Sequence, residues 1–182
     1  MNFQKVLSFL WETAKLVLIS LIIILPIRYF VVQPFFVLGA SMEPTFTDGD
    51  YLIINELTYL TTGEPTRGDV VVFKYPYDQS KYYIKRIVGL PGEIVVIADD
   101  GVTIKNKEHP EGFALNEEYL PPNRETYGNA TVALGNDEYY VLGDNRGASS
   151  DSRMWGPLKR EFITGKVLLR AFPFEKAELF MD

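Results

Sequence analysis

The feature that most limits the possible folds of this 182-residue chain is a long apolar segment close to its N-terminus. Residues 16–27 are uncharged, and past Arg28 the chain continues with a second apolar run that ends near Val37. A helix needs about 20 apolar residues to cross a bilayer, and the two runs together reach that length if the charge of Arg28 extends to the interface. We therefore predict a transmembrane anchor at residues 15–34, with Pro26 accommodated as a kink.

Three alternatives to this anchor remain open. The span could start upstream, near Val6, with Trp11 as an interfacial side chain. The segment could instead be a cleaved secretory signal that ends at the small residues Gly39 and Ala40, or it could be a buried core helix. Cleavage after Ala40 would fall within a motif described below, which makes the secretory signal unattractive.

The charges that flank the apolar segment predict its orientation. Lys5, Lys15 and the free amino group precede it, against the acidic Glu12. Cytoplasmic flanks have an excess of basic residues, so this asymmetry places residues 1–14 in the cytoplasm and residues 35–182 outside. We therefore expect a single-pass protein of the cell membrane whose folded domain is extracytoplasmic.

Composition excludes several classes of function. The net charge of −6 and the lack of a basic stripe argue against nucleic acid as a partner. The sequence has no cysteine, which removes disulfides, thiolate metal sites and cysteine nucleophiles. Its single histidine, His109, lies in an irregular segment, so a His-rich zinc site cannot be built. Glycine motifs that bind phosphates or dinucleotides are missing too, and we predict no metal and no cofactor.

Beyond the apolar segment the chain changes to short runs typical of β-strands, separated by turn residues. The predicted strands cover residues 50–55, 69–73, 81–88, 93–97, 102–105, 138–142 and 166–172. Asp100 and Gly101 indicate a tight hairpin, because glycine adopts the positive φ that a two-residue turn requires. We therefore predict a mainly β fold whose antiparallel sheets form a partly closed barrel. Residues 109–130 have several Pro, Gly and Asn and no period, which predicts an irregular surface excursion.

Four segments are hard to explain as scaffold alone. They are residues 39–45, 67–73, 82–93 and 143–156. In the first of them, Ser41 lies between small residues and a proline-fixed turn. This setting favours an accessible hydroxyl group beside a backbone N–H.

In the third segment, Lys85 is the unusual residue. Strand alternation places it on the face of Tyr83 and Ile87, with Arg86 on the opposite face, so one of the two basic side chains faces inward or lies at a sheet edge. A buried lysine loses hydration, and its pKa can fall from about 10.4 to about 5–6. A neutral amine is a usable general base near neutral pH. The alternative is a solvated lysine on an edge strand, the ordinary environment of this residue type.

Together these segments, in this order behind an N-terminal span, resemble the type I signal peptidases, the membrane-bound serine proteases of bacterial export. The resemblance covers the anchor and nearly all of the remaining chain, and a short chain with one span is similar to the Gram-positive branch. It implies an endopeptidase that cleaves N-terminal signal peptides from exported preproteins after small residues of the Ala-x-Ala type. The partners that it implies are preprotein signal peptides, the lipid bilayer and the secretion translocon.

The resemblance also implies roles for individual residues. Ser41 would be the nucleophile, with its backbone N–H in the oxyanion hole, and Lys85 would be the general base. Residues that aim the amine or support the site through ion pairs would be Ser149, Asp151, Arg153, Asp144 and Arg86. Of these, Ser149 would hydrogen-bond the amine, Asp151 would pair with Arg153, and Asp144 would pair with Arg86. Shallow pockets for small substrate side chains would be formed by Val37, Leu38, Gly39, Met42, Tyr83 and Ile84.

The sequence departs from the family pattern at two places. Many relatives have a serine two positions before the nucleophile, whose hydroxyl is the second oxyanion donor. Here that position is Gly39, so a backbone group or a water molecule must supply the donor. Gly147 and Ala148 stand where the family often has Asp-Asn, while the spacing of the site residues that follow is kept.

Two other functions compete with the peptidase. One is a catalytically silent, membrane-tethered β module that binds exported chains, and the presence of both Ser41 and Lys85 argues against it. The other is a self-cleaving regulator with a Ser–Lys pair. The anchor, the acidic charge and the lack of a DNA-binding segment argue against that function.

Overall fold

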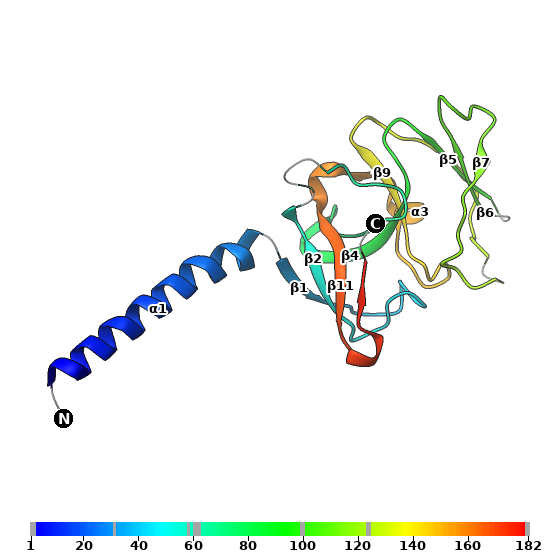
Figure 1. Cartoon of the computed structure of the whole chain (residues 1–182). Coiled ribbons are helices and arrows are strands. Elements are labelled where there is room, and N and C mark those ends of the chain that lie inside the picture. Colours follow the sequence, from blue (N-terminus) through cyan, green and yellow to red (C-terminus); the bar gives the residue numbers. More distant parts are fainter. Residues whose placement is uncertain are drawn as a thin grey trace.

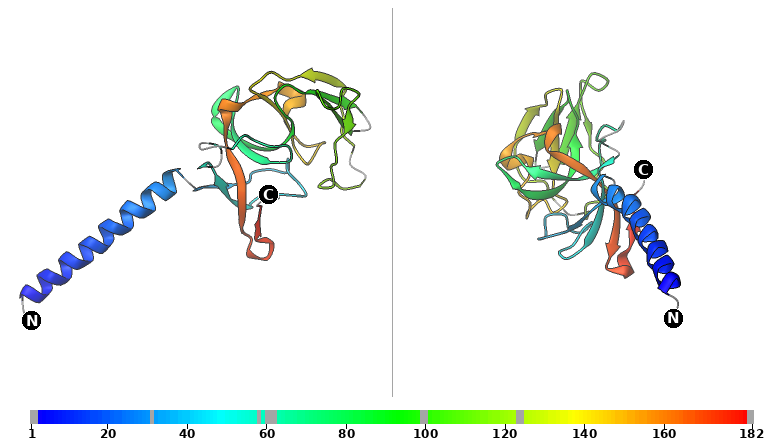
Figure 2. Two further views of the ribbon diagram at one scale, coloured as in Figure 1. Left: turned by 45° about the horizontal axis from the view of Figure 1, so that its top comes forward. Right: turned by 90° about the vertical axis from the view of Figure 1, so that its left-hand side faces the viewer.

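The computed structural model describes residues 3–30, 32–57, 59, 63–98, 101–122 and 125–180. Its N-terminal part is one long helix, α1 (Phe3–Phe30), which extends away from a β-domain (Figures 1 and 2). Within α1, Val6–Ile24 is long and apolar enough to cross a membrane, and none of it is buried against the rest of the chain. This exposure contradicts the buried core helix, because a core helix covers its apolar side chains with other parts of the protein.

The apolar helix begins well before residue 15, where the anchor was predicted to start. The candidate span starts at Val6, in agreement with the upstream alternative. At the other end, β1 (Val32–Phe36) pairs with β2 (Tyr51–Asn55), so the chain has entered the sheet two residues after the helix ends. The position of the membrane boundaries themselves stays a prediction.

The larger of the described sheets contains the strands nearest the candidate site. Its order is β1, β2, β11 (Ile163–Phe172), β3 (Val70–Tyr75), β4 (Asp78–Gly89), β9 (Glu138–Leu142) and β10 (Leu158–Lys159), with β12 (Glu178–Leu179) paired to β11. All these pairs are antiparallel, as predicted. Among the described residues β1 and β10 do not pair with each other, so the path is open and closure into a barrel is not observed.

A smaller antiparallel sheet lies at the far end of the domain from α1 (Figure 1). Its order is β7 (Phe113–Ala114), β6 (Gly101–Lys105), β5 (Ile94–Ala98) and β8 (Ala130–Ala133). The predicted hairpin between β5 and β6 is confirmed, although residues 99 and 100 of its turn lie outside the described part. The described part of the 109–130 excursion contains only the short strand β7 before β8 begins, and the rest of it is irregular.

Short helical turns complete the described elements: α3 (Ser152–Trp155), η1 (Arg160–Phe162) and η2 (Phe174–Lys176). All seven predicted strands are confirmed, with ends that differ by up to three residues. Strands β1, β7, β8, β10 and β12 were not predicted. β1 was missed because the predicted anchor at residues 15–34 covers its first three residues, and β7, β10 and β12 have only two residues each.

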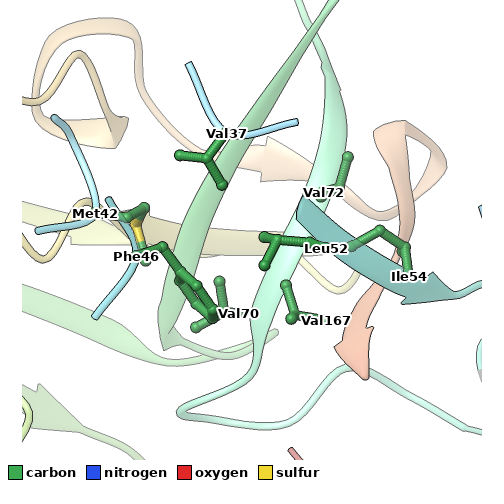
Figure 3. Packing of buried hydrophobic residues seen from close by; sticks show 8 residues of the cluster. All are labelled: Val37, Met42, Phe46, Leu52, Ile54, Val70, Val72 and Val167. Atoms are coloured by element: carbon green, nitrogen blue, oxygen red, sulfur yellow. The ribbon is translucent and has the colours of Figure 1, made fainter. Parts of the chain in front are cut away.

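One of the hydrophobic clusters holds the turn around Ser41 against the larger sheet (Figure 3). From the turn region it contains Val37, Met42 and Phe46, which pack against residues of β2, β3 and β11. Met42 and Phe46 have no exposed surface. Met42 was predicted to line a substrate pocket, and its side chain lies in this core, beside Ser41 in sequence; its contact with substrate stays a prediction.

Candidate active site

Ser41 and Lys85 come from different elements and meet beside β4 of the larger sheet. Ser41 lies in a turn closed by the bonds from Glu43 N to Ala40 O (3.2 Å) and from Phe46 N to Met42 O (2.9 Å). Lys85 is in the middle of β4. Its Nζ lies 2.9 Å from Ser41 Oγ and 2.7 Å from the carbonyl oxygen of Ile84. The structure therefore places an amine and a hydroxyl within hydrogen-bond reach, 44 positions apart in the sequence.

The Lys85 amine lies in a dry environment. The residue is 4% exposed, which excludes the solvated edge position that is the ordinary environment of a lysine. Burial lowers the pKa of Lys85 from 10.5 to about 8, and the nearby carboxylates of Asp151 and Asp144 act in the opposite direction. A substantial fraction of the amine is therefore neutral at mildly alkaline pH, as a general base requires.

Asp144 and Arg86 form the first of the two expected ion pairs. The guanidinium donates to both carboxylate oxygens, from Nε at 2.9 Å and from Nη2 at 2.7 Å. The Thr45 hydroxyl also donates to this carboxylate, at 2.5 Å, and Arg86 Nη1 donates to the carbonyl of Gly68 at 2.9 Å. The pair thus joins β4 to the loop after β9 and to the turn that contains Ser41.

Asp151 and Arg153 form the second ion pair, with Nη2 and Oδ2 2.8 Å apart. Asp151 is fully buried, and its carboxylate also accepts the backbone N–H of Gly143 at 3.0 Å. Arg153 Nη2 donates to the carbonyl of Arg146 at 2.7 Å. These bonds close the 143–153 loop on itself, so that it forms one rigid wall of the site.

Ser149 lies in this loop, but the hydrogen bond to Lys85 that was expected of it is not made in this structure. Its Oγ is buried and has no hydrogen-bond partner among the described residues. A buried hydroxyl without a hydrogen-bond partner is unfavourable, so its presence here calls for a functional reason. Gly143 provides the space: a Cβ on this residue would lie 2.2 Å from Ser149 Oγ and 2.5 Å from the carbonyl oxygen of Ser41.

The backbone N–H of Ser41 is a free donor among the described residues. The N–H of Ser41 makes no hydrogen bond to another described residue, whereas its carbonyl accepts from Asn145 N at 3.0 Å. The N–H of Gly39 donates to Asp48 Oδ1 at 2.7 Å, and Gly39 has a positive φ of 84°. The second oxyanion donor that many relatives take from a serine side chain is therefore not supplied by the backbone N–H of Gly39 in this conformation.

A cavity of about 480 Å³ opens beside Ser41 and Lys85. Four of the predicted pocket residues line it, namely Val37, Leu38, Tyr83 and Ile84, while Gly39 and Met42 do not. The sequence prediction missed other lining residues, which are Phe35, Phe36, Val72, Lys81, Tyr82 and Ser150. Phe35 and Phe36 lie close to the nucleophile motif in the sequence. They could have been predicted to line the site if the strand that contains them had been distinguished from the anchor.

No group of His, Cys, Asp or Glu side chains in the described part of the chain could hold a metal ion. His109 is exposed, and its ring packs edge-on against Phe113 at 5.2 Å, in the small sheet. The arrangement at the site is thus a hydroxyl, a buried amine and a free backbone N–H beside an apolar cavity. This set of groups can perform acyl transfer by a nucleophile–base pair.

Comparison with known proteins gives the same result along nearly the whole chain. The family model described as "Signal peptidase, peptidase S26" matches residues 10–172. The chain is 37% identical over 179 residues to a probable signal peptidase I-2 of Synechocystis sp., with 94% of this chain and 77% of the relative covered. It is 34% identical over 177 residues to a signal peptidase I of Bacillus licheniformis, with 92% and 91% covered. A crystal structure of a signal peptidase I from Enterococcus faecalis has 30% sequence identity and a TM-score of 0.48, and covers 58% of this chain and 98% of that one.

Proposed function

This chain belongs to the signal peptidase family, peptidase S26, and is a serine peptidase that cleaves signal peptides, and we propose that Ser41 is its nucleophile and Lys85 its general base. The observation that supports this assignment is the 2.9 Å separation of Lys85 Nζ and Ser41 Oγ in a buried setting. No other basic group is needed, because the lowered pKa of Lys85, about 8, makes its neutral form accessible.

In the proposed first step, neutral Lys85 accepts the proton of the Ser41 hydroxyl while Ser41 Oγ attacks the carbonyl carbon of the scissile bond. The negative oxygen that forms would accept a hydrogen bond from the free N–H of Ser41. The Lys85 ammonium then gives its proton to the leaving amine as the C–N bond breaks. A water molecule, deprotonated by Lys85, hydrolyses the acyl-enzyme and restores the Ser41 hydroxyl.

Ser149 and the ion pairs would support this chemistry without touching the scissile bond. A rotation of the unpartnered Ser149 Oγ toward Lys85 would satisfy the hydroxyl and aim the amine at Ser41. The Asp151–Arg153 and Asp144–Arg86 pairs would hold the 143–153 loop and β4 in place. Because each acid has its own arginine, neither acid is left as an uncompensated charge that would keep Lys85 protonated.

The substrate would bind as an added strand along β4. β4 pairs with β9 only from Arg86 onward, so no described strand pairs with residues 81–85 on the side opposite β3. An extended peptide placed there would gain main-chain hydrogen bonds, and alternate side chains would enter the cavity. Its apolar lining, with Val37 and Ile84 beside Ser41, favours short apolar side chains at the cleavage site, in keeping with the Ala-x-Ala type.

A strongly curved sheet is part of this proposal. Phe35 of β1 and Tyr82 of β4 belong to strands that do not pair, yet their rings lie 5.3 Å apart. This contact across the cavity supports partial closure of the larger sheet toward a barrel. The curvature would bring the end of β1 opposite the free edge of β4, with the substrate between them.

We further propose that α1 is a transmembrane anchor with its N-terminus in the cytoplasm, and that the domain lies against the outer lipid surface. Phe36, Leu38, Phe172 and Phe174 are half or more exposed, with Leu38 at 85%. Phe36 and Leu38 also line the cavity, and the hairpin that contains Phe174 extends downward from the domain, as α1 does, in Figures 1 and 2. An exposed apolar surface on the side of the anchor is what lipid contact requires. The site would then receive signal peptides still held in the membrane, with the secretion translocon nearby.

The alternatives are less favoured. A silent binding module has no use for a buried amine beside a hydroxyl, because burial of the amine lowers stability. A self-cleaving regulator is disfavoured by the long apolar helix in front of the domain.

The proposal is tested by incubating the detergent-solubilised protein with a preprotein that has an Ala-x-Ala site. Mass spectrometry should find a single new N-terminus directly after the second alanine. Ser41→Ala and Lys85→Ala should each abolish the product, with losses on the order of a million-fold as for other nucleophile–base pairs. Substantial activity in either variant would refute the assignment of the pair.

A further inference from the structure

Arg146 is a buried cation that the proposed chemistry does not use. Its side chain has no exposed surface, and it pairs with Glu117. Its Nε donates to the carbonyl of Gly143 at 3.2 Å, and its Nη1 donates to the hydroxyl of Thr126. Glu117 and Thr126 both belong to the excursion that was predicted to lie loosely over the surface. A buried charge is retained at a cost in stability, so this contact between the excursion and the 143–153 loop needs an explanation.

The same part of the excursion also contacts β4. The ring of Tyr119 lies under the Arg86 guanidinium, 4.0 Å from its centre, and Tyr119 Oη donates to Glu117 Oε1 at 2.9 Å. Burial raises the pKa of Tyr119, so the phenol keeps the proton that it donates. Arg86 is the neighbour of Lys85 in sequence and the partner of Asp144. Glu117 therefore connects two cations that flank the site. It binds Arg146 of the loop directly, and it is linked to Arg86 of β4 through Tyr119.

A third contact comes from the end of this segment. Arg153 Nη1 donates to the carbonyl of Tyr127 at 3.2 Å, while the rest of its guanidinium binds Asp151 and the carbonyl of Arg146. The contacts with Arg146 and Arg153 are to the 143–153 loop, which reaches Ser41 through the bond from Asn145 N to the Ser41 carbonyl. The excursion thus contacts both the 143–153 loop and β4.

We infer that Glu117, Tyr119 and Arg146 are positioning residues for the peptidase reaction, which hold the 143–153 loop and β4 together and so keep water away from the Lys85 amine. The inference rests on the proposed role of Lys85 as the base. None of the three side chains lines the cavity beside Ser41. Their effect on the rate therefore acts through Lys85 and not through contact with the substrate.

The pH dependence of the reaction distinguishes this role from a general effect on stability. The groups that face Lys85 are Ser41 from the turn, Tyr83 from β4, and Asp144 and Asp151 from the loop, and Asp144 is itself paired with Arg86. If the loop loosens, water reaches the amine and its pKa rises toward the ordinary lysine value. At a pH below the pKa of Lys85 in both the wild type and the variant, each unit of that rise lowers the neutral fraction of the amine about tenfold.

The experiment measures kcat and KM of the full chain against pH, with a preprotein substrate, for Glu117→Gln and Tyr119→Leu. Glu118→Gln is the matched control, because Glu118 is exposed and, among the described residues, accepts a hydrogen bond only from Asn116. In both test variants we expect the midpoint of the rise in kcat to move to higher pH. The activity should be about tenfold lower at pH 7 for a shift of one unit, with KM unchanged and with recovery at alkaline pH.

Wild-type midpoints in folded Glu117→Gln and Tyr119→Leu, or an equal shift in Glu118→Gln, would overturn the inference. Circular dichroism establishes which variants fold. If Glu117→Gln does not fold, Tyr119→Leu decides, and if neither folds the segment is a folding requirement and the inference fails. Lys85→Ala is measured alongside: activity in that variant would refute the base itself, whereas an inactive Lys85→Ala with unshifted test variants refutes only the positioning role.

Discussion

Replacement of Gly143 by alanine should separate the two halves of the active site. A Cβ at this position would lie 2.5 Å from the Ser41 carbonyl oxygen and 2.6 Å from Ser149 Cβ. Ordinary contact begins near 3.4 Å, so the loop and the Ser41 turn must move apart by about 1 Å. Overpacking of this kind costs about 1–3 kcal/mol, and a 1 Å misplacement of reacting groups can lower the rate about 100-fold.

The assay for Gly143→Ala combines the rate of preprotein cleavage with the midpoint of thermal unfolding. Gly147→Ala is the matched control in the same loop, because nothing lies within 4 Å of its Cβ and its φ is not positive. We expect Gly143→Ala to be about 100-fold slower while Gly147→Ala keeps the wild-type rate. Cleavage by Gly143→Ala at the wild-type rate would show that the spacing between the loop and Ser41 does not control the reaction.

Three further predictions follow from the burial of the site and its exposed apolar rim. Lys85→Met should be inactive but more stable than the wild type below pH 8, by about 1–3 kcal/mol, because the folded wild type there contains a protonated buried amine. The gain in stability should fade between pH 8 and 10.5, where the amine is neutral in the folded protein but still protonated in the unfolded one. Equal denaturant midpoints for the two proteins at pH 7 would contradict this prediction. The value of kcat/KM should rise about tenfold from pH 7 to pH 9 as Lys85 becomes neutral, and a rate maximal at pH 5 would argue against a lysine base. Since the chain has no cysteine, a polarity-sensitive dye can be attached to Phe174→Cys or, as a control, to Tyr127→Cys. In lipid vesicles the emission of the dye at position 174 should shift to the blue and that of the dye at position 127 should not, and equal spectra would argue against lipid contact at the hairpin.

The sequence predicted the parts of the fold that depend on local patterns. The central strands were found because their apolar and polar residues alternate, and their antiparallel pairing followed from the turns between them. Strand β1 was missed because the predicted anchor at residues 15–34 covers the first three residues of Val32–Phe36. Strands of two residues, such as Phe113–Ala114, are too short for any period to be visible.

At the active site, the sequence identified residue types but not their surroundings. Strand alternation left open whether Lys85 or Arg86 faces inward, and the structure buries Lys85 beside Ser41 while Arg86 reaches Asp144. The resemblance assigned Met42 to a substrate pocket, and the sequence does not reveal that its side chain packs in the core. Glu117 and Arg146 are 29 residues apart in the sequence. Their contact depends on the course of an irregular segment, which no periodic pattern encodes.

The central claim is that the amine of Lys85 is dry enough to lose its proton near neutral pH. Its most direct test is a titration of the 13Cε chemical shift of Lys85 in isotope-labelled protein, with Lys85→Met used to assign the signal. The account predicts a midpoint near 8, well below the ordinary lysine value. A midpoint near the ordinary lysine value of about 10.4 would mean that Lys85 stays charged, and would contradict its role as the base.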